Sequence, residues 1–353
     1  MPDDSPFHAH NGALTRYARQ FRFAPLGEDG QRRLLSSTAL VCGCGALGTV
    51  LANTLVRAGV GRLRIVDRDF VETTNLQRQV LFDEDDVAAQ LPKAVAAAEK
   101  LRRVNSTVEV EPIVADVDSG NVEGFAAGAD VILDGTDNFE TRFLLNDVAV
   151  KHGIPWVYGG CLGAEGQSMT ILPGETPCLR CLIPEPPPPG ATPTCDTAGI
   201  VAPIINVIAS IEALEAMKIL AGREDAISRS LQVFDLWENR CRQLDVGKLR
   251  GESDCPCCGR REFEWLAGMR ASQSTVLCGR NSVQIAPPAG WGLSLDELER
   301  KLDGVGSVKR NPFLLRLQIE PYQVTVFADG RAIISGTDDP ATAKTIYARY
   351  VGN

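Results

Sequence analysis

The feature that most constrains how this chain folds is a glycine-rich turn between an apolar strand and an apolar helix. The run Thr38–Cys42 predicts a short buried strand. Three glycines follow it at GxGxxG spacing, Gly43, Gly45 and Gly48, and a second strand ends at Asp67, 19 residues further on. Such glycines let phosphate oxygens approach the backbone at a helix N-terminus, and an acid at this distance accepts hydrogen bonds from ribose hydroxyls. We therefore predict a nucleotide site, and the motif alone fits both NAD and ATP.

The next 180 or so residues continue the alternation of strand and helix patterns. Further strands are expected at 109–114, 129–134, 155–158, 167–172 and 231–246, and helices at 15–35, 92–104, 141–152 and 204–220. Pro112 places the first of these strands toward a sheet edge, because proline donates no hydrogen bond to a neighbouring strand. The alternation predicts the α/β class, with a doubly wound, Rossmann-like and mostly parallel sheet.

Two domains are expected, because 353 residues are roughly 2.4 times the usual length of one. The first spans residues 1–268 and begins with a helical arm at 1–36. After about Trp265 the pattern changes to short strands at 276–278, 282–285, 314–319, 323–327 and 332–334, with helices at 295–302 and 341–350. These elements predict a small α+β unit at 269–353, called here the C-terminal module, whose role the sequence does not state.

Charge and apolar patterning exclude several classes of partner. Lys and Arg number 36 against 45 Asp and Glu, a net charge of −9, and no basic run interrupts this balance. We therefore expect no nucleic-acid partner. Every apolar run is too short to cross a bilayer, so no membrane partner is expected either. The polar N-terminus lacks a signal-peptide pattern, and 11 cysteines in such a chain predict the reducing cytoplasm.

A polar run, DRDFVETTNLQRQ, follows the second strand at Asp67–Gln79. Its Asn, Gln and Arg side chains suit phosphate better than a nicotinamide ring, because a guanidinium makes bidentate contacts with phosphate oxygens. Lys93, at the start of the next helix, adds a second cation at the same sheet edge. Asp137, in the run DGTDN after a buried strand, is placed to hold Mg²⁺, which takes carboxylate and phosphate oxygens. These residues favour ATP over NAD.

Two C-x-x-C pairs provide ligands for a metal. Cys178 and Cys181 form the first pair, and Cys255 and Cys258 form the second. Four thiolates close the tetrahedral shell of Zn²⁺, so we predict a structural zinc site with Cys257 as a bystander.

Cys195 stands in the run TCDTAGI, directly after the exposed proline-rich stretch 184–190. Its place at the end of a loop and ahead of a helix makes it a candidate reactive thiol, with inert packing as the alternative. The remaining cysteines are expected to pack in the interior: Cys42, Cys44, Cys161, Cys241 and Cys278.

Taken in order, these motifs resemble those of the MoeB/ThiF adenylyltransferases, relatives of the ubiquitin-activating enzymes. The matching runs, over roughly residues 14–265, are RYARQ, GCGALG, DRDFVETTNLQRQ, LPK, DGTDN, CLRC, TCDTAGI and CPCCG. The resemblance implies an enzyme that binds MgATP and adenylates the C-terminal Gly-Gly carboxylate of a small ubiquitin-like sulfur carrier, MoaD- or ThiS-like, releasing pyrophosphate. It also implies molybdopterin or thiamine biosynthesis as the pathway, a homodimer, and a cysteine desulfurase or another sulfur donor as a partner.

The resemblance further assigns roles to single residues. Asp67 would hold the ribose, and Asp137 would hold Mg²⁺. Arg19 would reach the γ-phosphate in the neighbouring subunit, and Cys195 matches the cysteine that joins the activated carrier in ThiF-like members. The catalytic set is Arg19, Arg78, Lys93, Asp137 and Cys195. The nucleotide-binding set is Gly43, Gly45, Ala46, Gly48, Asp67, Asp69, Thr74, Asn75, Leu76, Gln77, Arg78, Lys93, Asp137 and Asn138.

Three alternatives stay open on the sequence alone. In a conjugating system, Cys195 would carry a ubiquitin-like protein onward as a thioester. An NAD-dependent oxidoreductase and a non-catalytic scaffold are the other two. The C-terminal module departs from the simplest family pattern. Cys278 suggests the loop of the rhodanese domain that some members carry, but the module is too short for that domain. Carrier recognition and dimer support are hypotheses for it.

Overall fold

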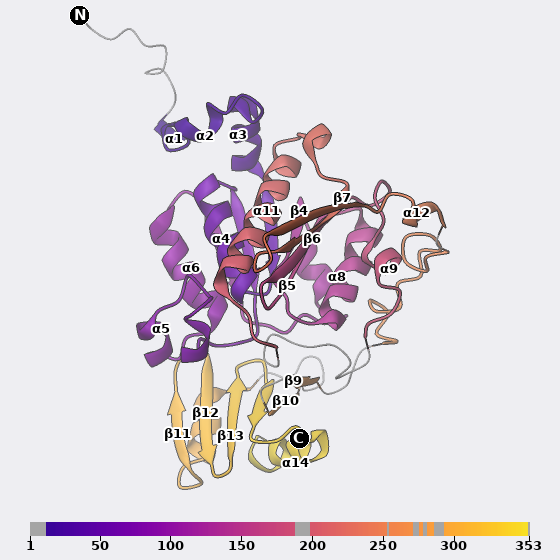
Figure 1. Cartoon of the computed structure of the whole chain (residues 1–353). Coiled ribbons are helices and arrows are strands. Elements are labelled where there is room, and N and C mark those ends of the chain that lie inside the picture. The colour runs from indigo at the N-terminus through magenta and orange to yellow at the C-terminus, as the bar shows by residue number, and fades with distance from the viewer. Residues whose placement is uncertain are drawn as a thin grey trace, which may run out of the picture.

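The computed structural model describes residues 12–187, 198–252, 254–270, 275–277, 281–285 and 293–351 (Figure 1). Its larger sheet has eight strands in the order β3-β2-β1-β4-β5-β6-β7-β8. The strands are β1 Thr38–Cys42, β2 Arg62–Val66, β3 Glu109–Ile113, β4 Val131–Asp134, β5 Trp156–Leu162, β6 Glu165–Ile171, β7 Ser230–Asp235 and β8 Arg240–Asp245. Strands β1 to β5 pair in parallel, and β5 to β8 pair antiparallel.

This sheet confirms the predicted α/β class and corrects one detail. β3, which contains Pro112, is the edge strand, as the proline predicts. The expected strand at 231–246 is a hairpin, β7 and β8, which turns at Asn239 with a φ of 53°. β8 is exposed along its whole length. The prediction that Cys241 packs in the interior is therefore wrong, because Cys241 is exposed like the rest of this strand.

Helices cover the parallel part of the sheet on both faces (Figure 1). Ala39 and Val41 of β1 pack into one apolar cluster with α4, α6 and α11, whereas Leu40 and Cys42 pack into a second cluster with α7 and α8. The two clusters follow from the alternation of side chains along a strand. These helices are α4 Ala46–Ala58, α6 Lys93–Val104, α7 Val122–Ala126, α8 Phe139–His152 and α11 Ala202–Leu220. No described helix is long and apolar enough to cross a membrane.

Shorter helices complete the larger part of the chain. They are α1 Gly12–Thr15, α2 Ala18–Phe21, α3 Gly27–Ser36, η2 Thr73–Asn75, α5 Glu84–Ala88, α9 Leu179–Leu182, η3 Glu224–Ala226 and α12 Leu249–Glu252. The helical pattern predicted at 15–35 is thus broken into separate helices. The described part of the N-terminal arm packs on the C-terminal end of α4, where the Gln20 side-chain amide donates to the Ala58 carbonyl at 2.8 Å.

The C-terminal module forms a second sheet with its own apolar core. Its strand order is β11-β12-β13-β14-β10-β9, all antiparallel. The elements are β9 Thr275–Leu277, β10 Ser282–Ile285, α13 Leu295–Lys301, β11 Ser307–Arg310, β12 Leu314–Ile319, β13 Tyr322–Phe327, β14 Ala332–Ser335 and α14 Pro340–Tyr350. The sequence did not predict β11, a short polar edge strand. In Figure 1 this sheet, orange to yellow, lies beside α5 at one end of the larger sheet.

Candidate nucleotide site and metal centre

The predicted nucleotide site lies where the strand order changes direction. β1 stands between β2 and β4, and the chain leaves the carboxyl ends of β1 and β4 at Gly43 and Gly135. In open α/β sheets, ligands bind in the crevice at such a point.

Packing explains two of the three motif glycines. Gly43 has a φ of +87°, and a Cβ there would lie 2.4 Å from the Gly135 carbonyl oxygen. A Cβ on Gly48 would lie 1.9 Å from the Gly43 carbonyl oxygen. Gly45 differs, because a Cβ there would meet nothing closer than 3.9 Å. The open space above Gly45, at the start of α4, is where a ligand can approach the backbone.

Asp67 joins the end of β2 to the glycine turn. Its Oδ2 accepts from the backbone N–H of Cys44 at 2.6 Å, and its Oδ1 accepts from the N–H of Asp69 at 2.7 Å. Burial raises the pKa of Asp67 above its ordinary value, although Lys93 acts in the opposite direction. These two hydrogen bonds hold the Asp67 side chain beside the turn, and its role in ribose recognition stays a prediction.

Two segments 24 residues apart bring Asp69 and Lys93 together. Phe70 and Pro92 form an antiparallel bridge, and the Lys93 N–H donates to the Asp69 carbonyl at 2.9 Å. The Lys93 Nζ lies 3.1 Å from Asp69 Oδ2, and the lysine is only 3% exposed. The structure therefore confirms that Lys93 lies at the same sheet edge as the run after β2.

Arg68 lies among the acids of this edge. Its Nη1 is 3.0 Å from Asp116 Oδ1. Burial lowers the pKa of Arg68, but nearby carboxylates outweigh that effect and raise it above the ordinary value. They belong to Asp116, Asp69, Asp137 and Asp67. The predicted ribose-binding and Mg²⁺-binding acids thus act on one guanidinium.

The run after β2 contains both structural and exposed residues. Asn75 is buried, and its Oδ1 accepts from the Glu72 N–H at 3.0 Å, so its side chain holds the turn of η2. Arg78 donates to the Thr74 carbonyl at 2.9 Å and stays partly exposed, while Thr74 and Gln77 are exposed and Leu76 packs against the core.

Gln79 is a residue that sequence analysis did not select. It is 3% exposed, and its amide is near the open space above Gly45. Its Oε1 has no hydrogen-bond partner among the described residues. The sequence feature that could have identified Gln79 is its position at the end of the NLQRQ run.

The loop after β4 is held by Arg142, which sequence analysis also missed. Its Nε lies 3.0 Å from Oδ2 of the fully buried Asp134. Its Nη2 donates to the carbonyls of Thr136 and Gly159, each at 2.9 Å. Burial raises the pKa of Asp134, and Arg142 opposes that rise. The sequence feature that could have identified Arg142 is its position one helical turn after Asn138.

Asp137 and Asn138 end this loop and differ in what they do. Asp137 is exposed at the crevice. Asn138 caps α8, since its Oδ1 accepts from the Thr141 N–H at 2.8 Å. Capping accounts for Asn138 without a nucleotide.

One of the predicted catalytic residues, Arg19, does not lie at the crevice. Arg19 is exposed on α2, beside the C-terminal end of α4, whereas the glycine turn is at its N-terminal end. The 13 residues of α4 span about 20 Å. Arg19 is therefore remote from the crevice of its own chain, and its role in a neighbouring subunit stays a prediction. Cys195 lies outside the described residues, as does Cys278.

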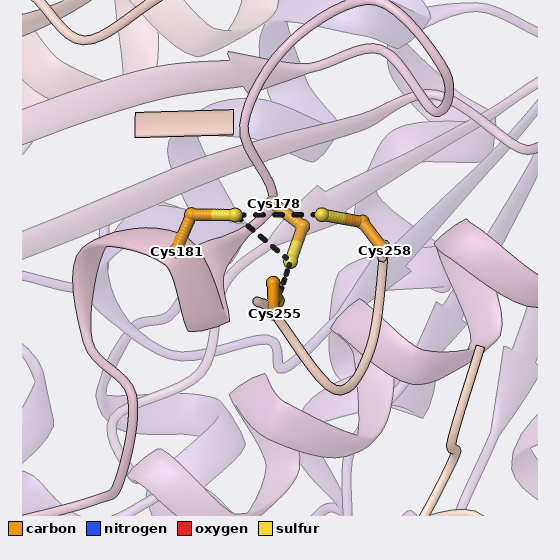
Figure 2. Close-up of side chains that lie close together, drawn as sticks. All are labelled: Cys178, Cys181, Cys255 and Cys258. Atoms are coloured by element: carbon orange, nitrogen blue, oxygen red, sulfur yellow. Dashed lines mark hydrogen bonds between the residues drawn. The ribbon is translucent and has the colours of Figure 1, made fainter. Parts of the chain in front are cut away.

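The four predicted metal ligands form one cluster (Figure 2). The Sγ atoms of Cys178, Cys181, Cys255 and Cys258 all lie within 4.8 Å of one another. The Sγ of Cys178 is 3.6 Å from that of Cys255, and the Sγ of Cys181 is 3.4 Å from that of Cys258. A tetrahedral Zn²⁺ with Zn–S bonds of about 2.3 Å separates its sulfurs by about 3.8 Å. The cluster fits such an ion.

Helix α8 supports the cluster from one side. The Asn146 Oδ1 accepts from the Leu179 N–H at 2.8 Å, and its Nδ2 donates to the Cys257 Sγ at 3.1 Å. Asp147 Oδ2 accepts from the Trp265 N–H at 3.0 Å. Cys257 thus stands beside the four ligands and outside the cluster, as predicted.

A depression of about 590 Å³ lies elsewhere, between the turn after β5 and the turn after β7. Its lining includes the acids Glu165, Asp235 and Glu238 and the exposed ring of Trp237. No cation is among the lining residues that the structure describes, and those residues do not suit a triphosphate.

Comparison with known sequences decides the family. A model of the ThiF family matches residues 17–257. The chain belongs to the ThiF family. The sulfur carrier protein ThiS adenylyltransferase of Bacillus subtilis (strain 168) is 44% identical over 339 residues, covering 96% of this chain and 99% of that protein. The SAMP-activating enzyme E1 of Haloferax volcanii is 44% identical over 246 residues, covering 70% of this chain and 89% of that protein.

Solved structures show the same fold for this ThiF-family chain. A crystal structure of E. coli MccB superimposes with a TM-score of 0.61 at 23% identity, covering 71% of this chain and 74% of that one. The predicted MoeB/ThiF family and the adenylyltransferase class are confirmed by the family match and the relatives. The roles of single residues stay predictions.

Proposed function

We propose that this ThiF-family protein uses ATP to adenylate the C-terminal Gly-Gly carboxylate of a small ubiquitin-like sulfur carrier. One observation supports this above the others. The open space above Gly45, the carboxylate of Asp67, and the pair of Lys93 and Asp69 meet at the β1/β4 crevice. This arrangement combines a backbone phosphate cradle, a ribose acceptor and a buried cation.

In the reaction, an oxygen of the carrier carboxylate attacks the α-phosphorus of ATP. The bond between the α-phosphorus and the bridging oxygen breaks, and pyrophosphate leaves with the electron pair. The nucleophile is already an anion, so no general base is needed. The protein has to align the two reactants and neutralise phosphate charge. Arg78 and Lys93 supply the positive charge, and the Asn75 side chain holds the turn of η2 that precedes Arg78.

Mg²⁺ would be held by Asp137, which is exposed at the crevice in the loop that Arg142 holds through the Thr136 carbonyl. When bound, it neutralises phosphate charge in the transition state. Zn²⁺ would be held by the four clustered cysteines. Because they fill its coordination shell, that ion would stabilise the fold and take no part in the chemistry.

The proposal also covers which carrier the protein uses and how its subunits assemble. The relative from B. subtilis spans nearly the whole chain, so a ThiS-like carrier for thiamine biosynthesis is the first to test, and a MoaD-like carrier for molybdopterin is the second. We further propose a homodimer in which Arg19 reaches the γ-phosphate in the partner's crevice. Cys195 would join the activated carrier, and a cysteine desulfurase or another donor would supply sulfur.

The test is ATP–pyrophosphate exchange by the purified protein with each carrier that ends in Gly-Gly. A carrier without this tail is the matched control. Exchange that requires the intact tail establishes adenylation, and the preferred carrier identifies the pathway. ATP binding without exchange for any carrier would contradict the proposal and favour the scaffold alternative.

Cys195 has an experiment of its own. If the sulfur donor first converts Cys195 to a persulfide, the outer sulfur would attack the acyl adenylate, AMP would leave, and the product would be an acyl disulfide. A phosphine reductant cleaves the S–S bond of that adduct, whereas the thioester that the bare Cys195 thiol would form in a conjugating system survives the phosphine. A Cys195→Ala chain that still performs exchange but forms no adduct would separate adenylation from the later step.

A further inference from the structure

The C-terminal module contacts the segment that follows β2. Phe70 of that segment belongs to a small apolar cluster with Leu314, Phe327 and Ile333 of the module. The guanidinium of Arg316 lies 4.3 Å from the centre of the Phe70 ring. The predicted nucleotide segment is therefore packed against the second sheet, although the two lie about 250 residues apart in the chain.

Polar contacts hold the same segment. Arg331 directly precedes the module's β14 and is 3% exposed, and its Nη1 donates to the Arg68 carbonyl at 3.1 Å. Gln284 of β10 donates to Asp116, the carboxylate that pairs with the Arg68 guanidinium. The module thus binds both the backbone of Arg68 and the acid that orients its side chain.

A third contact reaches the other half of the site. Asn311 donates from Nδ2 to the carbonyl of Gln90 at 2.8 Å. Its Oδ1 accepts from the N–H groups of Phe313 and Leu314, each at 2.9 Å, which keeps the amide in this orientation. Gln90 comes three residues before Lys93 and has a positive φ of 52°.

We propose that the C-terminal module positions the ATP site, with Arg331 and Asn311 as positioning residues. This inference rests on the proposed function. Both contacted segments are irregular, and they join each other through the Phe70–Pro92 bridge and the Lys93–Asp69 pair. A change of about 1 Å between them would separate the cation from the acid and weaken the phosphate site. The module contacts both segments and so restricts that movement.

The experiment uses the full chain and two independent substitutions. Arg331→Met removes the hydrogen bond to Arg68 and keeps most of the side-chain volume. Asn311→Asp keeps the acceptor for Phe313 and Leu314, removes the donor, and sets a negative charge against the Gln90 carbonyl. The matched control is Arg349→Met, an exposed arginine of α14 stacked on Tyr350. Equilibrium binding of a fluorescent ATP analogue is measured for each chain, together with ATP–pyrophosphate exchange at saturating carrier.

We expect Kd for the analogue and KM for ATP to rise about tenfold in both variants. We expect kcat to change less than twofold, Arg349→Met to match the parent, and Arg331→Lys to recover part of the loss. Hydrogen exchange at 68–72 and 89–93 should increase in the same two variants. Asn311 is partly exposed, so Asn311→Asp carries the test if Arg331→Met does not fold.

Nucleotide affinity unchanged within twofold in both folded variants would overturn the inference. A parent protein that binds the analogue but performs no exchange would refute the proposed adenylation, and the binding comparison would still decide the role of the module. A parent protein that binds no ATP would overturn both.

Discussion

The nucleotide crevice and the cysteine cluster lie along one helix, α8, and they are built in different ways. Arg142, in the first turns, holds the loop of the crevice, and Asn146, one turn further on, holds the cysteine knuckles. At the crevice, Asp137 and Arg78 remain open to solvent and to ligands. In the cluster, the four ligand atoms already face one another. The comparison teaches that a site for chemistry keeps charged side chains accessible to ligands. In a structural site, by contrast, the ligand atoms face one another inside the protein.

The largest effect is expected when a substitution breaks the cysteine cluster. Cys178→Ser should lose the bound metal and several kcal/mol of unfolding free energy, because structural zinc contributes on the order of 10 kcal/mol in small zinc domains. Metal content and thermal unfolding measure this. The control is Cys241→Ser on the exposed strand β8, which should behave as the parent. A Cys178→Ser chain with one equivalent of zinc and parental stability would refute the cluster as a metal site.

The next effect is expected at Arg142 of α8, the helix along which both regions lie. Arg142→Met should cost about 3–5 kcal/mol of unfolding free energy, because it leaves the carboxylate of Asp134 buried without its partner. It should also slow exchange, because the loop of Asp137 loses its anchor at Thr136. Urea unfolding and ATP–pyrophosphate exchange report the two effects. Asp134→Asn in addition should recover stability. Parental stability in the single variant would contradict the buried ion pair.

A third effect is confined to the crevice. Arg78→Ala and Asp137→Ala should each lower the exchange rate by about 10²-fold, or roughly 2.7 kcal/mol of barrier. Neither should change the unfolding free energy by more than about 0.5 kcal/mol, because both side chains are partly or fully exposed. Exchange kinetics and urea unfolding are measured on the same samples. Near-normal turnover in either variant would make the role proposed for that residue wrong.

The last effect varies with pH and concerns Glu212 of α11, which is buried against Gly159 of β5. Neither carboxyl oxygen has a hydrogen-bond partner among the described residues. Burial raises the pKa of Glu212 well above its ordinary value, Asp134 adds to the rise, and Arg142 opposes it. The folded protein therefore keeps this proton to a higher pH than the unfolded chain does. Stability that depends on the proton is lost as the pH rises between the two pKa values.

Glu212→Gln removes this titration. The unfolding free energy of the variant relative to the parent should therefore grow with pH, by up to about 1.4 kcal/mol per pH unit inside that window. Urea unfolding at pH 5, 7 and 9 measures this difference in unfolding free energy between variant and parent. The control is Glu165→Gln at an exposed position. A difference that stays constant with pH would show that Glu212 does not titrate in this range.

The motifs predicted the parts of the molecule that local rules control. A tight turn between a strand and a helix needs glycine at Gly43, and the spacing of two C-x-x-C pairs matches a tetrahedral ion. The edge position of β3 followed from Pro112, since that residue has no N–H to donate. These features depend on neighbouring residues or on fixed ligand geometry, and both are visible in the sequence.

The residues that sequence analysis missed depend on contacts between distant segments. Arg142 binds one carbonyl from the loop after β4 and one from within β5, and no periodic pattern in the sequence predicts that these two groups converge. The opposite error is also possible, because a motif can select residues that have a structural role, as Asn75 and Asn138 show. Each belongs to a nucleotide motif, and each is held by a hydrogen bond of its own turn. A motif identifies the loop, whereas the structure tells which side chains in it are free to reach a ligand.

The sequence by itself determined the family, the glycine turn and the four cysteines, because each is a short-range arrangement of residue types with one main physical use. Only the tertiary structure decided where the C-terminal module packs. Its contact with Phe70 and Arg68 joins surfaces about 250 residues apart. Such a contact follows from the shapes and charges of two assembled surfaces, which exist only once both sheets have formed.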